Sequence, residues 1–161
     1  MQHVYVNPDP GRFMTEPGPP IDPDGNPYRR LVQQHYSHDP WKQTVCCILL
    51  NRTRRCVLDR IRHRLFRAFP NPAAMAAADP ARVSRIIRSL GFQNRRARAL
   101  IRFSAEYDEW DRAGRPGGSE GLRDLYAVGD YAVDSWAIFV DGRRDVVPTD
   151  LKLIWWLAER A

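Results

Sequence analysis

The chain has 161 residues, of which 43% are hydrophobic and 11% aromatic, so it can bury one substantial core but hardly two. Its 25 Lys and Arg residues outnumber 19 Asp and Glu residues, which gives a net charge of +6 and favours an anionic partner. No apolar run approaches the roughly 20 residues that span a bilayer, and the N-terminus has no apolar signal-peptide core. Composition therefore argues against a membrane protein and predicts a soluble, intracellular one.

The cysteines indicate neither disulfides nor a metal site. Cys46, Cys47 and Cys56 lie inside apolar helical patterns, and their odd number without metal-ligand spacing predicts buried thiols in a reducing compartment. The sequence implies no metal and no cofactor.

The chain divides into an arm and a domain. Seven of the 13 prolines lie in residues 1–30, a density that opposes regular structure. We expect residues 1–27 to form a proline-rich, loosely ordered arm and residues 28–161 to form one domain.

Apolar residues recur at helical spacing from Tyr28 onward, and no segment alternates as a strand does, which predicts an all-α domain. Asp39 and Asp79 each precede a proline, as is typical of helix starts, and Thr53 is expected to cap a third helix. A short turn is expected over Leu31–Tyr36. The expected helices, in chain order, are Asp39–Leu49, Thr53–Phe69, a short alanine-rich helix after Pro72, Asp79–Leu90, Asn94–Trp110, Leu122–Tyr126, Tyr131–Val140 and one from Asp150. Gly114–Ser119 is expected to be a flexible connector.

Two arginine runs follow the central helices. Each is either a solvated face or a surface for phosphate contacts, to which the forked guanidinium group is suited. The runs are Arg52, Arg54, Arg55, Arg60, Arg62, Arg64 and Arg67, then Arg82, Arg85, Arg88, Arg95, Arg96, Arg98 and Arg102.

The stretch from Leu122 to Leu153 has the most specific pattern. Two helical segments are joined by the apolar-glycine turn Leu125–Gly129, and Thr149-Asp150 begins another helix after a short loop. Such a turn presents backbone N–H groups to a phosphate, because glycine allows close approach and a helix N-terminus attracts anions. A lone Asp at a helix start is usually a cap. Here we expect Thr149 to cap, which leaves Asp150 available and, at the positive end of the helix, ionised.

This turn and Asp150 resemble the helix–hairpin–helix DNA glycosylases of base excision repair, a family in which that Asp is catalytic. The segments LVQQHYSHDPWKQTVCCILLNRTRR, LGFQNRRARALIRFSAEY, VGDYAVDSWAIF and VPTDLKL are similar to the glycosylase domain of the methyl-CpG-binding-domain thymine glycosylases. The resemblance covers the chain from about Tyr28. It implies two helical lobes flanking a cleft, and a monomer acting on double-stranded DNA with a mismatched or damaged base.

The chain departs from the family at two positions and lacks one feature. Ala127 replaces the first glycine of the hairpin, whose residues Ala127, Val128 and Gly129 would face the DNA backbone. Tyr131 stands where bifunctional members have a nucleophilic lysine, so the resemblance implies a monofunctional enzyme; Tyr131 could also be a packed core residue. The iron–sulfur members have four cysteines after the catalytic Asp, and none follow Asp150, which implies no iron–sulfur cluster.

The resemblance also assigns the remaining site residues. Gln33 and Tyr131 would line the base pocket, where the Gln33 amide offers a donor and an acceptor. Lys152 is close to Asp150 in the sequence, and we expect it to support the pocket through phosphate or electrostatic contacts. The DNA contacts would be Arg52 beside Asn51, filling the gap left by the flipped nucleotide, and the turn Leu90-Gly91-Phe92, wedged against the orphan base. Without the family, Gln33 could be a surface residue, Arg52 part of a basic face, and Phe92 a core anchor.

These residues predict a monofunctional glycosylase that flips thymine or uracil opposite guanine and hydrolyses its glycosidic bond, with Asp150 and Tyr131 at the catalytic site. It would be nuclear if eukaryotic. Two alternatives stay open: a non-catalytic helix–hairpin–helix module that binds distorted DNA, and a glycosylase for an oxidised or alkylated base.

Overall fold

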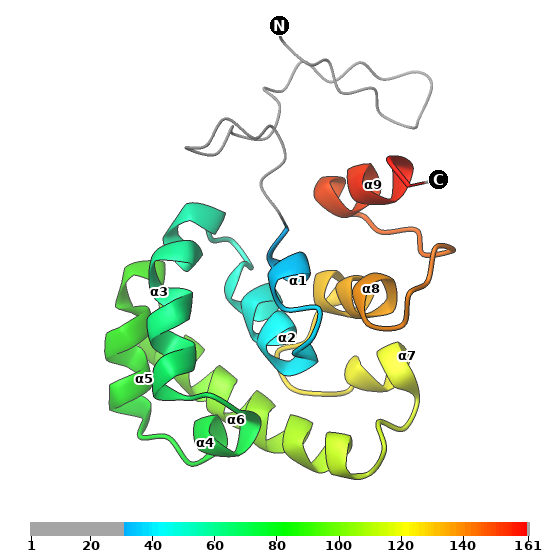
Figure 1. Ribbon diagram of the computed structural model, residues 1–161. Helices are drawn as coiled ribbons and strands as arrows, with labels where there is room; N and C mark the ends of the chain where they lie inside the picture. Colours follow the sequence, from blue (N-terminus) through cyan, green and yellow to red (C-terminus); the bar gives the residue numbers. More distant parts are fainter. Residues whose placement is uncertain (1–30, 161) are drawn as a thin grey trace, which may run out of the picture.

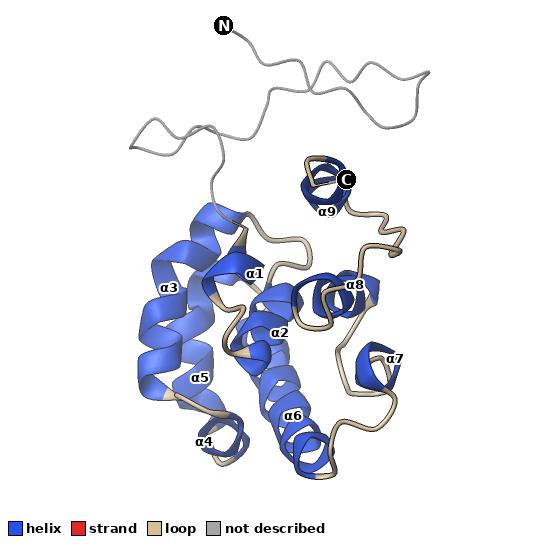
Figure 2. Ribbon diagram, turned by 45° about the vertical axis from the view of Figure 1, so that its right-hand side comes forward, coloured by secondary structure: helices blue, strands red, loops and turns tan. Residues whose placement is uncertain are grey.

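The computed structural model describes residues 31–160, and the arm expected at residues 1–27 lies outside this range. Every regular element within the described range is helical, which confirms the all-α prediction (Figure 2). The elements are α1 (Val32–His35), α2 (Pro40–Leu49), α3 (Arg55–Ala68), α4 (Pro72–Ala76), α5 (Pro80–Ile87), the 3-10 turn η1 (Arg88–Leu90), α6 (Gln93–Arg112), α7 (Gly118–Leu122), α8 (Asp130–Phe139) and α9 (Leu151–Ala158). None of these helices is long and apolar enough to cross a membrane.

The helices form two groups. Helices α3 and α5 lie together on one side, and α7, α8 and α9 lie on the other, with α1 and α2 between them (Figure 1). Helix α6 runs beneath, and α4 packs against it below α3 and α5. This arrangement confirms the two expected helical lobes.

Helix α6 joins the groups through buried aromatic side chains. Trp136 of α8 packs against Trp110 and Tyr107 of α6, with ring centroids 5.4 and 6.2 Å apart. Trp41 of α2 donates its indole N–H to Ser104 Oγ of α6 at 3.1 Å. Because α2 and α8 are both fixed to α6, the groups that they carry hold a defined position relative to one another.

The helix starts agree with the expected caps at Asp39 and Asp79. Asp39 accepts a hydrogen bond from the Lys42 N–H, and Asp79 accepts one from the Ala81 N–H. The expected Thr53 cap is wrong: Arg54 is the N-cap of α3 and makes no side-chain cap. The Thr53 hydroxyl instead accepts from an arginine of α6.

The prediction for the cysteines is correct at two of three positions. Cys46 and Cys47 are buried in α2. Cys56 is exposed, because it lies on the outward face of the first turn of α3.

The connection between α7 and α8 is more compact than the sequence suggested. Helix α7 ends at Leu122 rather than continuing to Tyr126, and it begins inside the segment expected to be a flexible connector. The Tyr126 N–H donates to the Glu106 carboxylate at 2.6 Å, and the Arg102 guanidinium lies 4.0 Å from the Tyr126 ring centroid. These contacts with α6 hold residues 123–129 as a turn and prevent the helix from continuing.

Ala127 has a left-handed backbone in this turn, with φ of 64°. An L residue with a side chain costs roughly 1–2 kcal/mol there, which explains why glycine is favoured at this position. Glycine at the same place would avoid the clash but lose roughly 0.5–1 kcal/mol to chain entropy.

Ala127→Gly should therefore raise the free energy of unfolding by up to about 1 kcal/mol, or the melting temperature by roughly 2–4 °C. The matched control is Ala105→Gly, at an exposed position with a right-handed helical backbone in α6, which should lower stability by about 1 kcal/mol. Thermal and urea unfolding of both variants would test this. Equal destabilisation by both changes would mean that Ala127 is not strained.

Candidate functional site

A cavity of about 490 Å³ opens between α1, the end of α2, the loop at residues 50–54, the α7–α8 hairpin and the start of α9. Its volume lies within the range usual for small-molecule sites. The predicted site residues that line it are Gln33, Asn51, Arg52, Ala127, Gly129, Tyr131, Asp150 and Lys152. Leu90, Gly91, Phe92 and Val128 are not part of the lining.

Gln33 is fully buried, so the reading of this residue as a surface side chain is wrong. Its amide Nε2 donates to the Tyr131 hydroxyl at 2.8 Å and to Ser135 Oγ at 2.9 Å. The Cys47 sulfur lies 3.8 Å from the same nitrogen. The amide oxygen Oε1 is buried and has no hydrogen-bond partner among residues 31–160.

The hydroxyl and thiol around this amide are neutral at physiological pH. Burial raises the pKa of Tyr131 far above its ordinary value, and the Asp150 carboxylate adds to that effect. Burial also raises the pKa of Cys47 to about 12. Both groups can therefore donate or accept hydrogen bonds, but neither supplies a charged nucleophile.

Asp150 is the N-cap of α9, so the expectation that Thr149 would cap this helix is wrong. The first helical residue is Leu151, which places Thr149 one position before the cap. Asp150 Oδ1 accepts from the backbone N–H groups of Lys152 at 3.0 Å and Leu153 at 3.1 Å. Within residues 31–160, Asp150 makes no ion pair, and its second oxygen has no hydrogen-bond partner, so one oxygen caps the helix and one is free.

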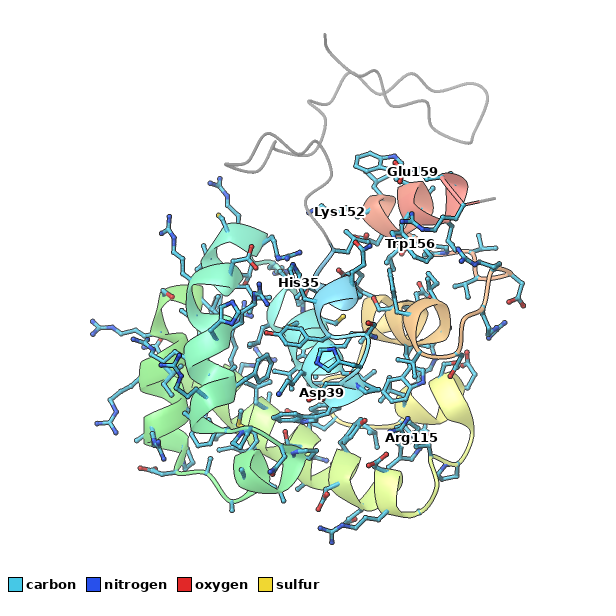
Figure 3. The ribbon with its side chains drawn as sticks, in the orientation of Figure 1. His35, Asp39, Arg115, Lys152, Trp156 and Glu159 are labelled. Atoms are coloured by element: carbon cyan, nitrogen blue, oxygen red, sulfur yellow. The ribbon has the colours of Figure 1, made fainter. Side chains whose placement is uncertain are left out.

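Lys152 lies at the start of α9 with an exposed side chain, as Figure 3 shows. It lines the same cavity as Asp150 without pairing with it. The lysine thus adds a positive charge to the lining of the cavity.

The loop that carries Arg52 is held by Arg96 of α6. The Arg96 guanidinium donates to the carbonyls of Leu49 and Asn51, at 2.8 and 3.1 Å, and to Thr53 Oγ1 at 2.9 Å. Arg52 itself is exposed and has a left-handed backbone, with φ of 57°. Arg96 therefore holds the loop on both sides of Arg52 and leaves the Arg52 side chain exposed at the cavity.

The turn before α6 carries residues that were predicted to contact DNA, and only one of them, Phe92, is exposed. Phe92 is 77% exposed and has a left-handed backbone, so its interpretation as a core anchor is wrong. Leu90 is buried in the core, so its side chain is not placed to contact DNA. Phe92 therefore presents its ring to solvent beside the start of α6.

The hairpin presents backbone donors at the edge of the cavity. The Val128 N–H donates to the Leu125 carbonyl, and the Val128 side chain packs against the core. The N–H groups of Ala127 and Gly129 have no partner within the part of the chain that the structure describes. Asp130 is the first residue of α8, and its carboxylate pairs with Arg123 across the hairpin.

Sequence reasoning missed three residues that support the site: Cys47, Ser135 and Arg96. Ser135 lies one helical turn after Tyr131, so the helical spacing of α8 could have indicated that both face the same way. Arg96 belonged to a run interpreted as either solvated or DNA-facing, yet its bonds are to the protein. Across residues 31–160 there is no cluster of three or more His, Cys, Asp or Glu side chains that could hold a metal ion.

Comparison with known proteins places this site in a family. Residues 45–154 match the HhH-GPD superfamily of base excision DNA repair proteins, and the chain belongs to that superfamily. The matched range includes the hairpin and Asp150, and it confirms the resemblance drawn from them.

Three curated relatives refine the comparison. A methyl-CpG-binding domain protein 4-like protein from Arabidopsis thaliana is 29% identical over 150 residues, which are 91% of this chain and 30% of that protein. A thymine-DNA glycosylase from Aeropyrum pernix is 38% identical over 94 residues (58% and 42%), and a thymine/uracil-DNA glycosylase from Pyrobaculum aerophilum is 30% identical over 105 residues (65% and 46%). The chain thus spans less than half the length of each relative.

Two solved structures share the fold. A thermostable thymine-DNA glycosylase has a TM-score of 0.65 and 21% identity, with 82% of this chain and 70% of that chain covered. A trapped endonuclease III–DNA covalent intermediate has a TM-score of 0.62 and 16% identity, with coverage of 76% and 66%. At these identities the likeness establishes the fold alone.

Arg96→Ala should lower the free energy of unfolding by about 2–4 kcal/mol, because it removes charge-assisted hydrogen bonds and leaves the partly buried Leu49 carbonyl without this partner. The matched control is Arg95→Ala, at an exposed neighbouring position, where we expect a change within about 0.5 kcal/mol. Urea unfolding measures both. If the two variants have the same stability, Arg96 does not hold the Arg52 loop.

Proposed function

We propose that this chain is a monofunctional DNA glycosylase that removes thymine or uracil opposite guanine by hydrolysing the N-glycosidic bond. The observation that carries the proposal is that one cavity brings together a buried amide, a neutral tyrosine and a carboxylate with one free oxygen. The names of the Aeropyrum and Pyrobaculum relatives support the choice of thymine and uracil.

The base must leave the helix before it can react. Inside a duplex the sugar C1′ atom is inaccessible, so the nucleotide is flipped outward, and a mispaired base costs less to extract than a paired one. In this proposal the flipped pyrimidine enters the cavity, where Gln33 and Tyr131 contact its edge. Lys152 contributes a positive charge near the mouth, beside the backbone of the flipped nucleotide.

Asp150 acts on the sugar. As the bond between C1′ and the base nitrogen lengthens, the electron pair leaves with the base and the sugar becomes cation-like. The free Asp150 oxygen stabilises that charge and orients a water molecule, whose oxygen bonds to C1′ while its proton passes to the Asp150 carboxylate. The base, which leaves as an anion, takes up a proton from solvent. The products are the free base and an abasic site.

The exposed groups around the cavity hold the DNA. Arg52, beside Asn51, occupies the gap left by the flipped nucleotide, and Phe92 stacks against the orphan guanine. The free N–H groups of Ala127 and Gly129 bind a backbone phosphate. Because arginine–phosphate contacts supply much of the affinity, binding by this monomer weakens as salt concentration rises.

The enzyme is proposed to be monofunctional because Tyr131 offers no amine at the position of the lysine nucleophile. A Schiff base with the sugar needs a primary amine. The strand should therefore remain intact until the abasic site is cleaved by alkali.

Asp150→Asn should abolish base release while the protein stays folded and binds DNA, because asparagine caps a helix as well as aspartate but carries no charge. We expect a loss of at least about 1,000-fold in the single-turnover rate on G·U and G·T duplexes. The matched control is Asp79→Asn, which replaces the N-cap of α5 and should leave the rate unchanged. A variant with wild-type activity would remove Asp150 from the mechanism.

The same assay separates the alternatives. If wild-type protein releases no base from any lesion-bearing duplex, the chain is a DNA-binding module. If it releases only oxidised or alkylated bases, the reaction stands and the proposed substrate is wrong. Cleavage of the strand without alkali would contradict the monofunctional assignment and point to Lys152 as the amine.

A further inference from the structure

We propose that Ser135 fixes the orientation of the Gln33 amide, so that the cavity selects bases with a proton on N3. Ser135 is a positioning residue: it acts through Gln33 and does not line the cavity. The inference rests on the function proposed above and specifies how the site would recognise uracil or thymine.

Both amide protons of Gln33 are directed at α8. Tyr131 and Ser135 are one turn apart and therefore lie on the same face of that helix. Gln33 Nε2 is 2.8 Å from the Tyr131 hydroxyl oxygen and 2.9 Å from Ser135 Oγ. An amide nitrogen carries two protons, so these two bonds use its whole donor capacity.

The carbonyl oxygen of the Gln33 amide has no hydrogen-bond partner within residues 31–160. Gln33 is fully buried, and its Oε1 is a buried acceptor without a partner. A buried polar atom left in this way costs roughly 1–3 kcal/mol. Gln33 also lines the cavity, and α8 occupies the nitrogen side, so the carbonyl oxygen is the group left for a ligand.

Cys47 explains why the amide does not adopt the reverse orientation. A hydroxyl has one proton, and a hydroxyl can either donate or accept toward Gln33. The Cys47 sulfur lies 3.8 Å from Gln33 Nε2, so it is a further, weak acceptor that faces the amide nitrogen. Ser135 Oγ accepts from the same nitrogen at 2.9 Å, whereas in the reverse orientation the carbonyl oxygen would have only the weak S–H donor of Cys47 at this place.

An acceptor at this place discriminates between pyrimidines. Uracil and thymine carry N3–H between two carbonyl oxygens, whereas cytosine has a lone pair at N3. The Gln33 oxygen would accept the N3 proton of uracil or thymine, and it would repel the N3 lone pair of cytosine. A methyl group at N3 would remove the proton and collide with the same oxygen.

The test compares uracil with N3-methyluracil, each placed opposite guanine. In one arm, 2′-fluoro nucleotides block cleavage and the dissociation constant is measured; in the other, the single-turnover rate of base release is measured. We expect wild-type protein to favour uracil by about 100-fold or more, since a site built to bind an N–H rejects an analogue without one. A preference below about 3-fold in both arms would overturn the inference.

Ser135→Ala should lower that preference to about 10-fold or less, because the amide is then free to turn over. A duplex with an abasic-site analogue has no base to contact Gln33, so Ser135→Ala should bind it as tightly as wild-type protein does. A general structural defect would weaken this binding as well. Ser135→Thr keeps the hydroxyl and should restore the preference. If Ser135→Ala weakens both duplexes equally, Ser135 has only a structural role. If that variant does not fold, the wild-type comparison decides.

The two proposals can fail separately. Wild-type protein that releases uracil and N3-methyluracil at equal rates would be a glycosylase without this selectivity. Protein that releases no base, yet binds the 2′-fluorouracil duplex far more tightly than its N3-methyl counterpart, would retain the selectivity and lose the catalytic role.

Discussion

Asp150 has two tasks, and the rest of the site depends on how its carboxylate divides them. One oxygen accepts from two backbone N–H groups at the start of α9, while the other has no partner within residues 31–160 and belongs to a residue that lines the cavity. The cap fixes the orientation of the side chain but leaves its negative charge uncompensated, whereas a salt bridge would neutralise that charge. Leu153, fully buried in the first turn of α9, anchors the helix that presents this carboxylate.

Helix α6 supports the site without lining the cavity. Arg96 holds the loop that carries Arg52, and Glu106 holds the hairpin by accepting the Tyr126 N–H. Packing of Trp136 on α6 fixes α8, which carries the groups that orient Gln33. Small displacements of α6 would therefore reach the loop, the hairpin and the buried amide together.

The sequence was sufficient for the all-α class, the helix starts at Asp39 and Asp79, and the family, because these depend on local spacing and short motifs. It misplaced the end of α7, since that end depends on Glu106, a residue distant in the chain. It also assigned two caps wrongly. The Thr53 hydroxyl is bound by Arg96, and α9 begins one residue later than expected, so Asp150 caps it and Thr149 does not. The contacts of Glu106 and Arg96 are long-range, and such contacts leave no periodic signal in the sequence.

The most direct test of the central claim is a crystal structure of the Asp150→Asn variant bound to a duplex with a G·U mismatch. The account predicts an extruded uracil in the cavity, its edge against Gln33 and Tyr131, and its C1′ atom facing the uncapped end of the side chain at position 150. A uracil that remains stacked in the duplex, or a C1′ atom on the far side of the cavity from that side chain, would contradict the account.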